Sequence, residues 1–99
     1  MTTFLLTFER ITPESAADGD VAEDGVLWEG ISLREGIDEL RNAECIEANE
    51  YPLESPRWVT AYGPQDIFTG DRMNISLHFP EHLTPSTRRR IVRLIEAQR

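Results

Sequence analysis

Residues 72–79 constrain the fold most, because apolar and polar side chains alternate along this segment without a break. The apolar residues share one side of an extended strand: Met73, Ile75, Leu77 and Phe79. The polar residues share the other side: Asn74, Ser76 and His78. Pro80 ends the strand. A strand with a single apolar face predicts a sheet that is packed on one side and open to water on the other.

Four other segments are predicted to be strands of the same sheet. Residues 3–9 alternate in the same way, and the short apolar run 26–28 can pair with them. Residues 45–48 and 57–62 are the remaining candidates. The turn Thr69-Gly70-Asp71 predicts that 57–62 and 72–79 form a hairpin whose arm includes Ile67 and Phe68.

Two helices are predicted from their caps and apolar faces. Ser32 and Glu35 form a capping-box pattern before a helix over 33–43, whose inner face carries Leu33, Ile37 and Leu40. Thr84 and Pro85 begin the last helix. Its inner face carries Ile91, Val92, Leu94 and Ile95, and its outer face carries Arg89, Arg90 and Arg93. The order β-β-α-β-β-β-α predicts one α+β domain over 1–99, with an antiparallel sheet of four to five strands and two helices on one face.

The charge is distributed unevenly, and this limits the partners that the chain can bind. The formal charge of the 99 residues is −8; residues 1–54 hold 14 acids and 3 Arg, and residues 55–99 hold 4 acids and 7 Arg. An acidic chain is repelled by nucleic acid and by anionic membranes, so neither is expected as a direct ligand. A basic protein is the expected partner.

Size and cysteine content exclude other classes of protein. A chain this short forms one two-layer core without the deep cleft of most cofactor-dependent enzymes, so no cofactor is expected. Cys45 is the single cysteine, which excludes an internal disulfide and indicates a reducing compartment. With no signal peptide and no apolar run of membrane-spanning length, a cytoplasmic location is expected.

The acidic residues of the first half are the main candidates for partner binding. Segment 12–25 lacks an apolar period and is predicted to be a long acidic surface loop. The candidates lie in that loop, on the first helix and near the third strand: Asp18, Asp20, Glu23, Asp24, Glu35, Asp38, Glu39, Glu44 and Glu47. They form either a solvated surface or a set that occupies a basic groove in the place of phosphates.

The run Arg88-Arg89-Arg90 with Arg93 is expected to need anionic partners, because it lies near the positive end of a helix dipole. Three sources are open. They are the acidic half of the same chain, the acidic half of a second copy in a homodimer, and an acidic or phosphate-bearing partner. Simple solvation of the arginines is the remaining alternative.

Sites for metals and for catalysis have weak support. His78, Glu81 and His82 lie close in sequence, but Pro80 prevents a shared helical face, so no metal is expected. A calcium-loop pattern at Asp18, Asp20, Asp24 and Glu29 lacks the required glycine. Cys45 is expected on a packed face and belongs to no nucleophile motif, so the chain is not expected to be an enzyme. A small-molecule or metal-binding domain or enzyme around the two histidines is the alternative.

Three motifs carry a resemblance to a group of proteins: 56–60 (PRWVT), 69–71 (TGD) and 76–84 (SLHFPEHLT). They resemble small acidic proteins of plasmids and integrative elements of proteobacteria. The likeness covers mainly residues 55–95. It implies a mobile-element setting and assigns no catalytic residues. With the charge pattern, it leads to the hypothesis of a non-enzymatic protein-interaction protein, for example an anti-CRISPR or anti-restriction inhibitor that blocks a nucleic-acid-handling defence complex.

Overall fold

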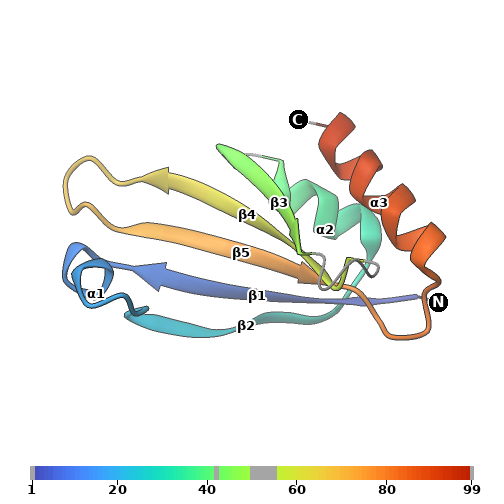
Figure 1. Ribbon diagram of the computed structural model, residues 1–99, viewed down its shortest axis with the longest axis horizontal. Helices are drawn as coiled ribbons and strands as arrows, with labels where there is room; N and C mark the ends of the chain where they lie inside the picture. Colours follow the sequence, from blue (N-terminus) through green and yellow to red (C-terminus); the bar gives the residue numbers. More distant parts are fainter. Residues whose placement is uncertain (1, 42, 50–55, 99) are drawn as a thin grey trace.

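The protein folds around one sheet of five antiparallel strands (Figure 1). The computed structural model describes residues 2–41, 43–49 and 56–98. The strands are β1 (Phe4–Ile11), β2 (Glu23–Ile31), β3 (Cys45–Asn49), β4 (Trp58–Gln65) and β5 (Arg72–His78). They are ordered β2-β1-β5-β4-β3, so β5, the strand with the clearest alternation, is at the centre.

Two helices, α2 (Leu33–Leu40) and α3 (Pro85–Ala97), pack on the same face of the sheet. The strands contribute Leu6, Val59 and Leu77 to the core, which lie in register across β1, β5 and β4. The helices contribute Ile37, Leu40, Ile91, Val92 and Ile95. The predicted α+β class and the placement of both helices on one face are therefore confirmed.

The helices cover only one end of the sheet. Figure 1 shows α2 and α3 over the end where β1 begins, whereas the other end extends past them and carries the short helix α1 (Pro13–Ala17) and the β4–β5 turn. The molecule measures 40 × 27 × 23 Å. Its two ends therefore differ in structure, and a large part of the sheet is open to solvent.

The helix caps follow the sequence only in part. Thr84 accepts a hydrogen bond from the backbone N–H of Thr87 at 3.2 Å, so α3 begins where expected. Ser32 accepts one from the N–H of Glu35 at 3.2 Å, but the Glu35 carboxylate accepts a bond from the Ser32 hydroxyl at 2.8 Å instead of returning to the backbone. The reciprocal capping box predicted there is half formed, and α2 ends at Leu40 rather than at residue 43.

The prediction of one long loop over 12–25 is wrong. Thr12 caps α1, with reciprocal hydrogen bonds to Ser15, and β2 begins at Glu23. The strand runs to Ile31, well beyond the predicted 26–28. Most of β2 is exposed, since it is an edge strand, and its pairing with β1 contains two register shifts. Exposure and bulges remove the alternation by which a strand is detected in a sequence.

Two further predictions are corrected at β3 and β4. β4 continues through Gly63 and Pro64 to Gln65, and Ile67 and Phe68 lie in the turn instead of a strand arm. Cys45 is exposed instead of packed. It pairs with Tyr62 on the sheet face opposite the helices.

Candidate functional site

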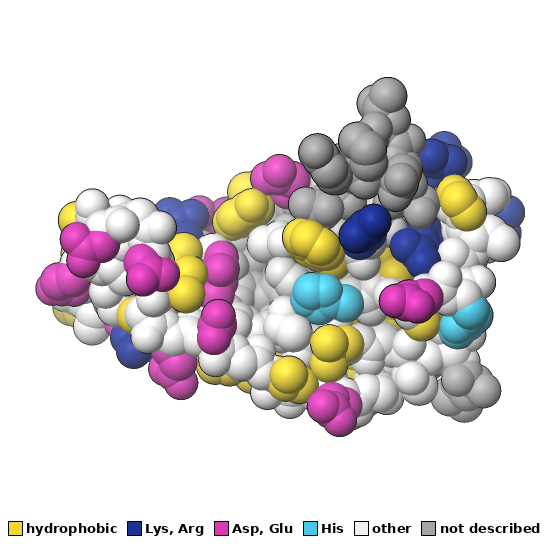
Figure 2. Space-filling view, turned by 60° about the horizontal axis from the view of Figure 1, so that its bottom comes forward, with side chains coloured by type: hydrophobic (Ala, Val, Ile, Leu, Met, Phe, Trp, Pro, Cys, Tyr) yellow, Lys and Arg dark blue, Asp and Glu magenta, His cyan; other side chains and the backbone are white. Residues whose placement is uncertain are grey.

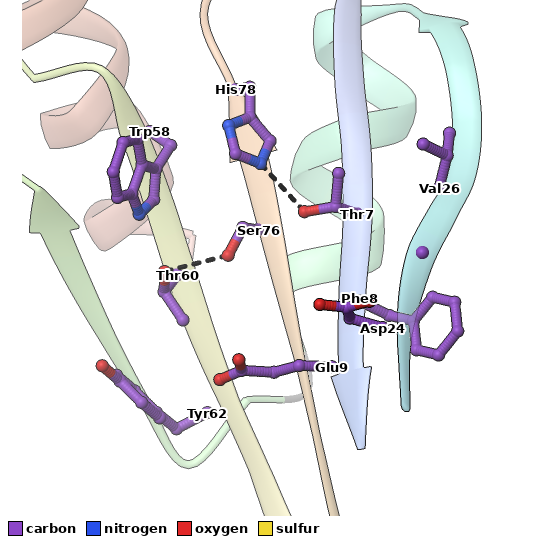
Figure 3. Close-up of a pocket in the computed structure, with 11 residues that line it drawn as sticks. Thr7, Phe8, Glu9, Asp24, Val26, Trp58, Thr60, Tyr62, Ser76 and His78 are labelled. Atoms are coloured by element: carbon purple, nitrogen blue, oxygen red, sulfur yellow. Dashed lines mark hydrogen bonds between the residues drawn. The ribbon is translucent and has the colours of Figure 1, made fainter. Parts of the chain in front are cut away.

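The sheet face opposite the helices holds a groove of about 560 Å³. Figure 3 shows side chains from β1, β5, β4 and β2 around it, and Figure 2 shows a hollowed face with a histidine near its centre and acidic side chains to one side. The alternation of β5 builds the floor, because Ser76 and His78 point away from the helices. Trp58, Thr60 and Tyr62 line the groove from β4, and Thr7 and Glu9 from β1.

Hydrogen bonds across the strands hold the polar floor of the groove. Thr7 Oγ1 and His78 Nε2 are 2.8 Å apart, and Thr60 Oγ1 and Ser76 Oγ are 2.9 Å apart (Figure 3). The Trp58 ring lies beside the imidazole, with centroids 5.6 Å apart and planes at 41°. A hydroxyl beside a histidine is one part of a nucleophilic triad. Among the described residues no carboxylate is hydrogen-bonded to the other imidazole nitrogen, so the third member of such a triad is not in place there.

Burial lowers the pKa of His78 below its ordinary value. The unfolded chain then binds a proton more readily than the folded one, so acid favours unfolding. We expect the free energy of unfolding to fall as the pH drops below about 6.5, until the lowered pKa is passed. Denaturant titrations at several pH values on both sides of about 6.5, the ordinary pKa of histidine, measure how the free energy of unfolding changes with pH.

The matched variants for this pH test are His78→Gln and His82→Gln. His82 is exposed in the turn before α3. In the His78→Gln protein, the free energy of unfolding is expected to depend less on pH than in the unmodified protein. The His82→Gln protein is expected to keep the full pH dependence. An identical slope in both variants would mean that the pH dependence comes from the carboxylates.

Acidic groups lie on the other side of the groove, and none of the described residues that line it is an arginine. Asn74 of β5 lies opposite both Glu9 and Tyr62 in the sheet, and its amide nitrogen donates to Glu9 Oε1 at 3.2 Å. Figure 3 shows Glu9 extending from β1 toward β4, whereas the Tyr62 ring points away from it. The Tyr62 hydroxyl donates a hydrogen bond to Glu47 Oε2 at 3.1 Å. Burial, as the larger cause, and this hydrogen bond both raise the pKa of the Tyr62 phenol. The sequence pattern did not single out Trp58, Tyr62 or Glu9. The period of two along 58–62 is the signal that places Trp58 and Tyr62 on one face.

The carboxylates of α1, the start of β2 and the β4–β5 turn gather at the end of the sheet away from α2 and α3. We define residues 13–24 and 66–71 as the acidic end. It holds seven acids and no basic residue: Glu14, Asp18, Asp20, Glu23, Asp24, Asp66 and Asp71. Arg10 joins its two segments, with 3.3 Å from Nε to Glu23 and 3.3 Å from a guanidinium nitrogen to Asp71. Figure 2 shows this concentration of acidic side chains at one end of the molecule.

The nine predicted partner-binding acids do not form one surface. Asp18, Asp20, Glu23 and Asp24 lie in the acidic end. Glu35, Asp38 and Glu39 are on α2, in the helical layer, where Asp38 pairs with Arg41 at 3.0 Å. Glu44 precedes β3 and pairs with Arg72 at 3.7 Å, while Glu47 lies on β3. The structure thus divides the set into three groups.

Within the described residues, the arginine run on α3 has no ion pair with the acidic half of the chain. Arg89, Arg90 and Arg93 are exposed on α3, and no carboxylate of the described residues lies within ion-pair distance of them. Arg88 turns inward and donates to backbone carbonyls instead (see Discussion). The prediction that the acidic half of the same chain pairs with these arginines is therefore wrong for the residues that the structure describes.

The metal form of the alternative site is not assembled. His78 points into the groove, whereas Glu81 and His82 are exposed in the turn that follows β5. In the described segments, no three His, Cys, Asp or Glu side chains lie close enough together to hold a metal ion.

No known protein family matches the chain, and no curated protein or solved structure is significantly similar to it. The resemblance of residues 55–95 to mobile-element proteins therefore stays a prediction. Within residues 2–41, 43–49 and 56–98, no helix has the length and apolar character needed to cross a membrane.

Proposed function

We propose that the protein is a non-enzymatic interaction protein that binds a basic protein surface through its acidic end. One observation carries this proposal. The acidic end holds seven carboxylates and no basic residue, and Arg10 reaches into it from outside to form ion pairs with two of them. Exposed like charges held together repel one another, and a cationic surface relieves that repulsion.

A basic nucleic-acid-binding groove is the partner surface that fits best. Such grooves use arginine and lysine to hold phosphates. Carboxylates of α1 and β2 offer similar anionic groups on a folded surface, so the protein would compete with nucleic acid. The mobile-element setting implied by the resemblance favours a host defence complex, such as an RNA-guided or a restriction nuclease, in the cytoplasm.

The charge at the opposite end supports one orientation of binding. Arg89, Arg90 and Arg93 lie exposed on α3, at the far end of a molecule 40 Å long. A basic groove attracts the acidic end and repels α3, so the approach is steered with the acidic end first. Steering of this kind predicts fast association that weakens as salt is added.

The test starts with expression of the chain in proteobacterial strains that each carry one RNA-guided or restriction nuclease. We expect phage plating to be restored in at least one strain. The purified nuclease then provides the binding assay. Asp18→Asn combined with Asp20→Asn is expected to weaken binding about tenfold at low salt, because two carboxylates of the interface lose their charge. Both residues are exposed, so folding should be unaffected.

The matched control is Glu81→Gln with Glu96→Gln, which removes the same charge from exposed positions outside the acidic end. This control is expected to bind within about twofold of the unmodified chain. Equal losses in the two double variants would show that only total charge matters and would contradict a specific role of the acidic end. Failure to restore plating in any strain would reject the defence-inhibitor form of the proposal.

A further inference from the structure

The turn between β4 and β5 is held rigidly by hydrogen bonds. Asp66 Oδ1 accepts bonds from the backbone N–H of Phe68 at 2.8 Å and of Thr69 at 3.0 Å. The backbone of Asp66 bonds to the Gly70 N–H at 2.8 Å and to the Asp71 carbonyl at 2.7 Å. Gly70 adopts φ of 79°, which closes the turn, and Gln65 donates to its carbonyl at 3.0 Å. These hydrogen bonds favour the conformation of the turn that the structure shows.

This rigid turn presents two large apolar side chains to solvent. Ile67 is 89% exposed and Phe68 is 91% exposed, whereas the other exposed large apolar residues of the described chain lie between 42% and 53%. Packing against the described part of the domain does not account for them, since almost all of their surface meets water. Burying such a pair on a partner removes apolar surface from water, and a preformed turn loses little entropy on binding.

Carboxylates surround this apolar pair. Asp66 and Asp71 belong to the same turn, and α1 packs against it, since a Cβ added at Gly70 would come 2.9 Å from Pro13 Cγ. Arg10 ties Asp71 to Glu23 of β2. An apolar centre with a charged rim is the usual arrangement of an interface hot spot.

We propose that Ile67 and Phe68 form an apolar anchor that inserts into a pocket of the basic protein bound by the acidic end. The inference rests on the proposed function and adds the contact that gives it specificity. Charge complementarity selects this occupant. The acidic rim is repelled by an anionic membrane and by the acidic end of a second copy. The exposed arginines of α3 in a second copy attract it, so a head-to-tail dimer is the competing occupant that the cross-linking below separates from a different basic protein. A basic surface with an apolar pocket satisfies both the rim and the centre.

The experiment places a photoreactive benzophenone amino acid at position 68 of the full chain, in cells of the strain in which the defence assay is positive. Matched chains carry the same group at position 20, in the acidic end, and at position 94 on α3, where Leu94 is 43% exposed. We expect the chain labelled at position 68 to form a cross-link to one basic protein. The chain labelled at position 94 should not form this product. Excess unmodified chain should compete, and chain with Phe68→Ala should compete about 30-fold less well.

Each other outcome overturns the anchor. Cross-linking from position 20 but not from position 68 would leave the acidic-end proposal standing and remove the anchor. A second copy of the chain, an acidic protein or lipid as the product at position 68 would identify a different occupant. Equal competition by the Phe68→Ala and unmodified chains would show that the pair lies near the partner without binding it. No product from position 20 or position 68 would reject both proposals.

Discussion

Replacing Arg88 with Met is expected to lower the free energy of unfolding by about 3 kcal/mol, because one guanidinium satisfies four backbone carbonyls. Nε donates to the carbonyl of Leu83 at 3.0 Å, and one terminal nitrogen donates to that of Pro56 at 3.2 Å. The other donates to the carbonyls of Pro80 at 3.2 Å and Glu81 at 3.0 Å. Methionine fills a similar volume but leaves all four acceptors without this donor.

Urea denaturation of the variant measures this loss, and thermal unfolding should show a midpoint lower by roughly 10 to 20 °C. Arg88→Lys is expected to recover less than half of the loss, because an ammonium group cannot reproduce the planar fork of donors. Arg89→Met is the matched control and should change stability by less than about 0.5 kcal/mol, since Arg89 is exposed. Equal stability of the Arg88→Met and Arg89→Met proteins would contradict the role given to Arg88.

For the arginine run of α3, the sequence predicts which side chains are exposed but does not predict the role of Arg88. A helical wheel correctly predicts that Arg89, Arg90 and Arg93 face solvent and that Ile91, Val92 and Ile95 are buried. It is wrong for Leu94, which it places on the inner face and which is 43% exposed, because this residue lies at the edge of that face. It cannot predict the role of Arg88, because the acceptors lie at residues 56 and 80–83 and meet only when α3 packs beside the ends of β4 and β5. Periodicity reports the faces of one element and does not identify the neighbours of that element.

The same limit explains the scattered acidic set. The sequence correctly places many carboxylates in the first half, but chain proximity is not spatial proximity. Asp66 and Asp71 come from the second half and still belong to the acidic end, whereas Glu35 and Glu39 lie on α2. The sheet order β2-β1-β5-β4-β3 decides this, because β1 lies between β2 and β5 and brings the turn after β4 beside α1.

The strand predicted over 57–62 stops before Gly63, and a Gly-Pro pair commonly interrupts a strand. The structure extends the strand past it by a register shift between Tyr62 and Gln65. A Cβ at residue 63 would collide with the backbone carbonyl of Met73 on β5. Gly63→Ala is therefore expected to destabilise the protein by about 3 kcal/mol, since the backbones of two paired strands must separate to accept the methyl group.

Gly25→Ala is the matched control for this prediction, and urea denaturation of the two variants is the measurement. At residue 25 of β2 the nearest atom to an added Cβ is Phe8 Cε1, at 3.1 Å, and a phenyl ring can turn aside. The change should stay within about 1 kcal/mol, because small packing strain is offset by the lower chain entropy of alanine in the unfolded state. If both variants unfold at the same urea concentration, β4 and β5 are not closely paired at Gly63, and the strand must end near Tyr62, as the sequence pattern indicated.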